Sequence, residues 1–75
     1  MLAMDLRKVF ATNLRRLRQK RGFTQEELAH VAHINRTYIS KLENGAFYVG
    51  LELVEKLADK LEVDPREFFI NRQNK

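Results

Sequence analysis

The chain has 75 residues, with 14 Lys and Arg against 10 Asp and Glu, a net charge of +4 and no cysteine. A chain of this length supports one small hydrophobic core, and the lack of cysteine excludes disulfides and cysteine-based zinc sites. The longest apolar run, residues 1–4, is far shorter than the roughly 20 residues that span a bilayer, and no signal-peptide pattern occurs, so we expect a soluble cytoplasmic protein.

Two helices are predicted in the first part of the chain. Apolar residues at helical spacing predict a helix over about residues 5–20, with Gly22 as its C-cap. The face of this helix is formed by Leu6, Val9, Phe10, Asn13, Leu14 and Leu17. Thr24 and Glu27 have the spacing of a capping box, which predicts the start of a second helix that runs through Ala32.

A third helix is predicted between Asn35, an N-cap residue, and the stop at Gly45. Ile39 and Leu42 lie three residues apart, so they define the buried edge of this helix. The side chains on the outward edge are then Arg36, Thr37, Ser40 and Lys41. This outward edge holds two cations and no carboxylate, which favours a polyanionic partner.

The last part of the chain predicts two more helices after a loop at residues 46–50. The buried side of the fourth helix is expected to hold Leu51, Val54, Leu57, Ala58 and Leu61. Residues 64–67 read as a second capping box, with Pro65 at the first helical position, and predict a short last helix. No stretch alternates long enough for a strand. We therefore expect an all-α fold with five helices, as one domain over residues 1–75.

The connection between the second and third helices points to a known motif. Only residues 33–35 separate them, which is the connection length of a helix-turn-helix, and Ala29 has the small side chain that a steep crossing requires. In that motif the second helix lies in the DNA major groove. We expect a helix-turn-helix at about residues 24–44 and double-stranded DNA as the partner.

The charge distribution agrees with this expectation. Residues 1–45 hold nine Lys or Arg against four Asp or Glu, a balance of +5, whereas residues 46–75 hold five against six, a balance of −1. The cations are therefore concentrated in the part that contains the predicted motif. Nucleic acid is the first candidate partner, and an anionic membrane surface is the second.

Three stretches carry a wider family pattern: NLRRLRQKRGFTQEELA at 13–29, INRTYISKLENG at 34–45 and LELVEKLADKLEV at 51–63, followed by DPREFF. With them the chain resembles the Cro and phage-repressor-like helix-turn-helix proteins, often called the XRE type. Among these it is most similar to small restriction-modification controller proteins. The resemblance implies a five-helix, lambda-repressor-like DNA-binding domain that regulates transcription.

The resemblance also implies roles for single residues. Gln25 and Asn44 match positions that contact the DNA backbone. Arg18 and Glu43 match an ion pair with a structural role, which ties the first helix to the end of the third. His33 departs from the family pattern, which often has Gly in this turn, and the aromatic loop at 47–50 departs from a common Pro.

The outward edge of the third helix supplies the expected base contacts. Arg36 can donate two parallel hydrogen bonds to guanine, with a phosphate contact or simple solvation as alternatives. Thr37 either contacts thymine or only stabilises the helix start. Lys41 is expected to make a phosphate or mixed contact, because its ammonium is a flexible point charge. Ser40 either contacts the groove or permits close approach.

Further backbone contacts are expected from two other residues. Tyr38 either packs partly in the core or places its hydroxyl at a phosphate. The basic run of the first helix comprises Arg15, Arg16, Lys20 and Arg21. Most charged helix faces are only solvated, so we expect one or two of these residues, Arg15 first, to face DNA.

A homodimer is expected from apolar residues near the end of the chain. The expected interface comprises Leu53, Phe68, Phe69 and Ile70, with ordinary core packing as the alternative. Two-fold pairing would set two recognition helices about 34 Å apart and predicts a palindromic operator.

Other classes of function have less support in the sequence. Ser40 is the only serine, and the carboxylates form no convincing acid-base pair, so we expect no enzyme and no small-molecule substrate. His30 and His33 lack further ligands nearby, so we expect no metal and no cofactor. The alternatives are an antitoxin or protein-interaction adaptor with the same fold, and a basic binder of RNA or lipid. We expect a nucleoid-associated location in the cytoplasm.

Overall fold

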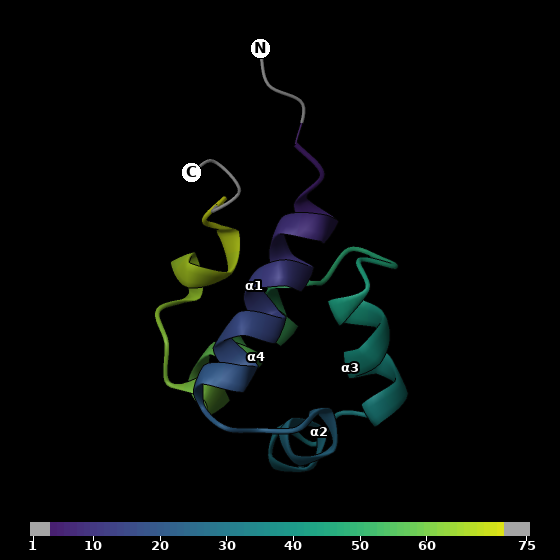
Figure 1. Cartoon of the computed structure of the whole chain (residues 1–75), viewed down its shortest axis with the longest axis vertical. Coiled ribbons are helices and arrows are strands. Elements are labelled where there is room, and N and C mark those ends of the chain that lie inside the picture. Colours follow the sequence, from purple (N-terminus) through teal and green to yellow (C-terminus); the bar gives the residue numbers. More distant parts are fainter. Residues whose placement is uncertain (1–3, 72–75) are drawn as a thin grey trace.

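The computed structural model describes residues 4–71, and these residues form helices joined by short connections. In chain order the elements are α1 (Leu6–Lys20), α2 (Gln25–Ala32), α3 (Arg36–Glu43), α4 (Leu51–Leu61) and the 3-10 helix η1 (Pro65–Phe69). Figure 1 shows α1 in the middle, with α3 on one side, η1 on the other and α2 across one end. The all-α prediction is confirmed, although the fifth element is a 3-10 helix instead of an α-helix.

Local capping explains where the first three helices begin. The Asp5 carboxylate accepts a hydrogen bond from the Arg7 amide at 3.0 Å at the start of α1. Thr24 and Glu27 form the predicted capping box of α2, with bonds of 3.0 and 2.8 Å. The side chain of Asn35 accepts from the Thr37 amide at 2.7 Å and caps α3. The predicted helix starts at Thr24 and Asn35 are therefore confirmed.

The turn between α2 and α3 depends on a left-handed residue. His33 has a φ of 57° and a ψ of 45°, a conformation that favours Gly but is more accessible to His than to most residues. The Ile34 amide then donates to the Ala29 carbonyl at 2.9 Å, which closes the end of α2. This closure lets α3 begin only a few residues later and in a new direction.

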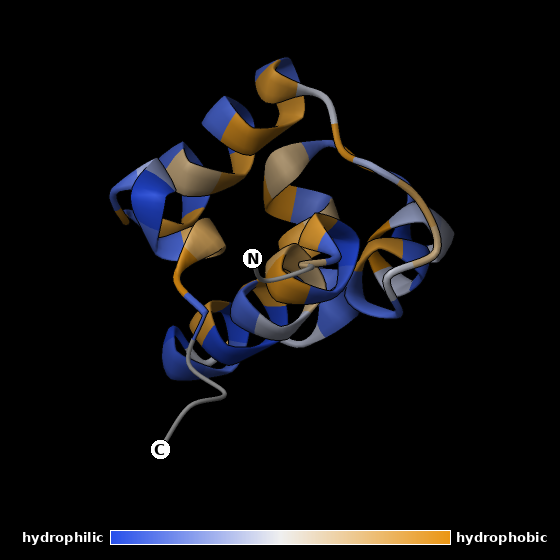
Figure 2. Ribbon diagram, turned by 90° about the horizontal axis from the view of Figure 1, so that it is seen from above, coloured by the Kyte–Doolittle hydropathy of each residue, from blue (hydrophilic) through white to orange (hydrophobic). Residues whose placement is uncertain are grey.

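The helices enclose a core of buried apolar side chains. Figure 2 shows apolar residues on the faces that the helices turn toward one another and polar residues outside. The core comprises Phe10, Leu14, Leu17, Leu28, Ala29, Ala32, Ile39, Leu42, Val54, Leu57, Ala58, Leu61 and Phe68. Ile39 and Leu42 are fully buried, as predicted, so the opposite edge of α3 faces outward.

One position on α4 contradicts the sequence prediction. Leu51 was expected on the buried side, but it is 80% exposed, whereas Val54, one turn later, is buried. Leu51 is the first residue of α4, and it lies at the rim of an apolar hollow instead of in the core. The periodicity of a helix does not reveal where the core ends along its axis.

The last element is attached to α1 through a buried amide. The side chain of Asn13 donates to the carbonyl oxygens of Phe68 at 2.9 Å and Ile70 at 2.8 Å. The ring of Phe68 is fully buried, and its centroid lies 5.0 Å from the centroid of the Phe10 ring. Asp64 accepts from the Arg66 amide at 2.9 Å, one residue earlier than the predicted capping box requires.

Candidate nucleic-acid interface

The outward edge of α3 carries a set of polar side chains above the buried Ile39 and Leu42. Arg36, Thr37 and Lys41 are exposed, and Ser40 is half-buried. Within residues 4–71, the cations of this edge make no ion pair with a carboxylate. The edge therefore presents uncompensated positive charge together with hydroxyl groups, which suits the phosphates and base edges of a major groove.

A buried carboxylate holds the end of α3 in place. Glu43, whose side chain is fully buried, accepts from Arg18 Nε at 2.6 Å and from Arg18 Nη2 at 3.0 Å. The same guanidinium donates to the Phe23 carbonyl at 2.8 Å. The ion pair that the family resemblance implied is present, and it joins α3, α1 and the segment that precedes α2.

Two residues expected at the DNA backbone contact the same carboxylate. Gln25 Nε2 donates to Glu43 Oε1 at 3.0 Å, and Arg15 Nε lies 3.6 Å from that oxygen. Gln25 is half-buried, and the Arg15 side chain is about half exposed. Both therefore brace the end of α3 and reach the surface beside it, where their predicted contact with phosphate stays a prediction.

The protonation of Glu43 follows from these contacts. Burial raises the pKa of the Glu43 carboxyl, but hydrogen bonds from Arg18 and Gln25 and the charges of Arg18 and Arg15 lower it. The net result is a pKa below the ordinary value of a glutamate, so the carboxylate stays ionised near neutral pH. The position of α3 thus depends on a charged group under its last turn.

Other cations of α1 are engaged within the chain. Arg16 Nη2 donates to Asn13 Oδ1 at 3.3 Å and lies 3.7 Å from Glu67 Oε1. Arg21 pairs with Glu62 at 2.9 Å and donates to a carbonyl of α4. These two arginines face η1 and the end of α4, so they are poor candidates for the surface that α3 presents.

Tyr38 and Asn44 flank the polar edge of α3. The Tyr38 ring is half-buried and meets Phe47 edge to face, with centroids 4.8 Å apart. The ring thus takes part in packing, and a phosphate contact by its hydroxyl stays a prediction. Asn44 is exposed at the end of α3. The next residue, Gly45, has a φ of 70°, which lies in the left-handed region that favours glycine.

One of the four predicted dimer residues does not lie at the surface. Phe68 was placed there, but it is fully buried in the core of its own chain, which corrects that assignment. Leu53 is half-buried against the core, whereas Phe69 and Ile70 are 38% and 39% exposed. Adjacent residues in η1 point in different directions, so only one of the two phenylalanines can enter the core.

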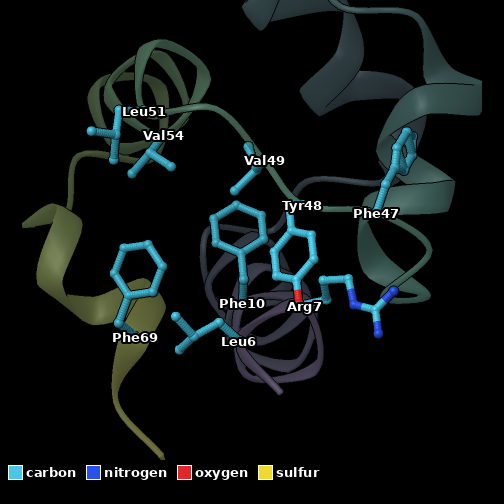
Figure 3. A pocket seen from close by; sticks show the side chains of 9 residues that line it. All are labelled: Leu6, Arg7, Phe10, Phe47, Tyr48, Val49, Leu51, Val54 and Phe69. Atoms are coloured by element: carbon cyan, nitrogen blue, oxygen red, sulfur yellow. The ribbon is translucent and has the colours of Figure 1, made fainter. Parts of the chain in front are cut away.

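The exposed apolar residues surround a hollow that sequence reasoning did not find. The hollow has a volume of about 270 Å³ between the start of α1, the loop 46–50, α4 and η1 (Figure 3). The hollow is lined in part by Leu51, Tyr48 and Phe69, and the Tyr48 side chain is 69% exposed. The only advance signal was the aromatic loop, which departs from the family pattern.

Metal-binding groups and membrane-spanning helices are both absent from the part of the chain that the structure describes. Among residues 4–71, no group of three or more His, Cys, Asp and Glu side chains is placed to hold a metal ion. No helix in the same range is long and apolar enough to cross a membrane.

Comparison with known proteins agrees with this geometry. The helix-turn-helix family HTH_3 matches residues 14–68. A Neisseria meningitidis protein described as a hypothetical transcription factor is 37% identical, over 95% of this chain and 67% of its own. Control protein C.BamHI from Bacillus amyloliquefaciens is 36% identical, over 84% of this chain and 79% of its own.

Solved structures give the same result for the fold. The crystal structure of the Neisseria transcription factor NHTF has a TM-score of 0.86 and 35% identity, and the match covers 97% of this chain and 86% of the other. The restriction-modification controller protein C.AhdI from Aeromonas hydrophila has a TM-score of 0.80 and 38% identity, with coverages of 84% and 96%. The chain belongs to the HTH_3 helix-turn-helix family.

Proposed function

We propose that the chain is a sequence-specific transcriptional regulator that binds operator DNA through α3. The observation that carries this proposal is the exposed edge of α3, on which Arg36 and Lys41 stand without a carboxylate partner among the described residues. Family membership supports it, because relatives are described as transcription factors and control proteins. The proposal assigns no catalytic step to the chain.

The proposed contacts divide between bases and backbone. Arg36 donates two hydrogen bonds to a guanine, and Thr37, Ser40 and Lys41 contact neighbouring groups in the groove. The sugar-phosphate strands are met by Gln25, Arg15, Tyr38 and Asn44, which surround the polar edge. Phosphate contacts fix the position of α3, and base contacts supply the sequence preference.

The proposed assembly is a homodimer on a palindromic operator. The exposed apolar residues Leu51, Phe69 and Ile70, together with the half-buried Leu53, form the corrected candidate interface. An exposed apolar patch of this kind is common at protein interfaces. A two-fold dimer would set both copies of α3 in successive major grooves on one side of the duplex.

The similarity to C.BamHI and C.AhdI favours one subclass of regulator. We propose a restriction-modification controller in which protein concentration and dimerisation set the response, acting in the cytoplasm at the nucleoid. The rival is an antitoxin or adaptor that uses the same fold to hold a protein. A rival that used the fold only to hold a protein would enrich no duplex sequence in a selection experiment.

The test begins with selection of duplexes from a randomised DNA library by the intact protein. We expect an enriched inverted repeat whose half-sites lie about 34 Å apart, and a footprint of the same symmetry. Arg36→Ala should lose about 1 to 3 kcal/mol of binding free energy and relax the preference at one base pair per half-site. The matched control is Arg66→Ala, because Arg66 is also exposed but lies on η1.

The comparison of two duplexes decides the role of Arg36. The parent, Arg36→Ala and Arg66→Ala are each titrated against the selected duplex and a random-sequence duplex. If the Arg36 variant keeps the parental ratio of the two affinities, Arg36 does not read a base. If the parent itself enriches no sequence, the proposal of an operator-binding regulator is wrong.

A further inference from the structure

We propose that Arg7 and Lys8, in the first turn of α1, form an additional DNA-backbone contact beside the last turn of α3. The inference rests on the proposed function, because it requires α3 to lie in a major groove. It assigns a binding role to residues outside the helix-turn-helix. It concerns phosphate contact only, so it predicts affinity and salt dependence and no base preference.

The backbone of α1 touches the chain directly after α3. A Cβ atom added to Gly45 would lie 3.6 Å from the Arg7 carbonyl oxygen and 3.6 Å from Cγ of Lys8. Gly45 follows Asn44, which is exposed and is a proposed backbone contact. The side chains of Arg7 and Lys8 therefore start at the same end of the recognition helix as Asn44.

Arg7 is held in a defined orientation. Its Nε and Nη2 atoms donate to the Asp5 carboxylate at 3.1 and 3.0 Å, and its guanidinium lies 5.0 Å from the centre of the Tyr48 ring. Within the described residues, Nη1 has no hydrogen-bond partner, so it is available to an external oxygen. A guanidinium braced in this way loses little freedom when it binds phosphate.

Tyr48 separates two different surfaces. Figure 3 shows Leu6, Val54 and Phe69 around the apolar hollow, which Arg7 and Phe47 also line. The guanidinium of Arg7, however, extends past Tyr48 toward the side of α3 and Phe47. The charged end of Arg7 thus points away from Leu51 and Phe69 of the candidate dimer surface. Its position suits a partner that approaches α3.

The charge of this region supports an anionic partner. The loop that follows α3, residues 46–50, contains no charged residue, so cations at this end must come from another element. Lys8 is exposed, and within residues 4–71 it forms no ion pair. A helix in the major groove has a sugar-phosphate strand along each side, and neutralised phosphates contribute much of the affinity.

The experiment measures DNA affinity over a series of salt concentrations. The parent, Arg7→Ala and Lys8→Ala are titrated against the selected duplex and against a random-sequence duplex. Each substitution should reduce the slope of log affinity against log salt concentration by about 1. It should lower the affinity for both duplexes by the same factor. The base preference obtained by selection should stay parental.

Arg66→Ala is the matched control for Arg7→Ala. Arg66 pairs with Asp64 at 3.0 Å across the same spacing as Arg7 with Asp5, and both aspartates cap the start of a helix. Arg66 belongs to η1, which packs against α1 and α4. Its substitution should therefore leave the affinity and the salt slope unchanged.

A further variant, Asp5→Asn, should raise the DNA affinity where the alanine variants lower it. Asp5→Asn retains a good N-cap but removes the carboxylate that faces Arg7 and would repel a phosphate. This variant should bind both duplexes more tightly, with a steeper salt slope than the parent. The matched Asp64→Asn variant should bind like the parent.

The outcomes separate the failure of the proposed function from the failure of the proposed contact by α1. If the parent binds no duplex, the proposed function fails. If the parent binds and Arg36→Ala relaxes the preference, but the Arg7 and Lys8 variants keep the parental slope, only the contact by α1 is overturned. Helical content and thermal midpoint are measured for every variant, and Lys8→Gln and Arg7→Gln decide the result if an alanine variant unfolds.

Discussion

At the scale of single residues, Glu43 determines where α3 sits. Its side chain has no exposed surface and receives hydrogen bonds from Arg18 and Gln25. A buried carboxylate is tolerated only when its oxygens are paired, because desolvation of an ion costs several kcal/mol. The pairing joins three segments that are distant in sequence, so its loss should displace the polar edge of α3.

Glu43→Gln is the substitution that tests this role. It removes the negative charge while leaving the buried Arg18 guanidinium in place, so we expect the free energy of unfolding to fall by about 3 to 5 kcal/mol at neutral pH. Chemical denaturation followed by circular dichroism measures the change. Gln19→Ala, at an exposed position of α1, is the control and should stay close to the parent.

The pH dependence of the same variant has a defined sign. Because the pKa of Glu43 is lowered in the folded chain, its contribution to stability is complete above the unfolded carboxyl pKa of about 4.3. That contribution is lost as the pH falls through the folded pKa. The stability difference between the parent and Glu43→Gln should therefore shrink in acid, and a difference that stays constant would contradict this account.

At the scale of elements, the turn between α2 and α3 carries a conformational cost. His33 occupies the left-handed region with a φ of 57°, where a side chain costs about 1 kcal/mol relative to Gly. His33→Gly should therefore raise the free energy of unfolding by up to about 1 kcal/mol. It should leave the base preference unchanged, because the direction of α3 stays the same.

His30→Gly is the matched control for the turn. His30 has the same side chain but lies in the last turn of α2, where Gly costs about 0.5 to 1 kcal/mol. The two substitutions should thus change stability in opposite directions in a denaturation experiment. If both variants lost the same free energy of unfolding, the His33 side chain would make a contact that stabilises the fold by more than its left-handed backbone costs.

At the scale of the whole molecule, the fold turns two different surfaces outward. The polar edge of α3 is one, and the apolar rim around Leu51, Tyr48 and Phe69 is the other. A small domain rarely leaves large apolar side chains exposed together without a partner. The interface that we propose therefore differs from the sequence prediction by the replacement of Phe68 with Leu51.

Leu51→Lys tests the assembly without disturbing the core. The variant should sediment as a monomer at concentrations where the parent is a dimer, and it should bind the full operator more weakly than the parent while keeping the thermal midpoint. Asp59→Lys also adds a lysine to α4, near its other end, and should keep the parental assembly. A parent that is monomeric at all concentrations would contradict the homodimer.

The sequence alone determined the helices, the N-caps of α2 and α3, and the outward edge of α3. Thr24, Asn35 and the pair Ile39 and Leu42 act through neighbours within four residues, so their effect can be read from spacing. The residues expected to face DNA were obtained in the same way, or by family resemblance. Local periodicity is sufficient wherever a helix has one clear buried side.

The packing of the helices sets which apolar residues at the ends of elements enter the core. Leu51 and Phe68 each fit an apolar pattern, yet the first is exposed and the second is buried. Phe68 is buried because Asn13 and Phe10, which are distant in sequence, hold η1 against α1. The stacking of Arg7 on Tyr48 likewise joins residues distant in sequence. Such contacts depend on how helices meet in space, which no local pattern records.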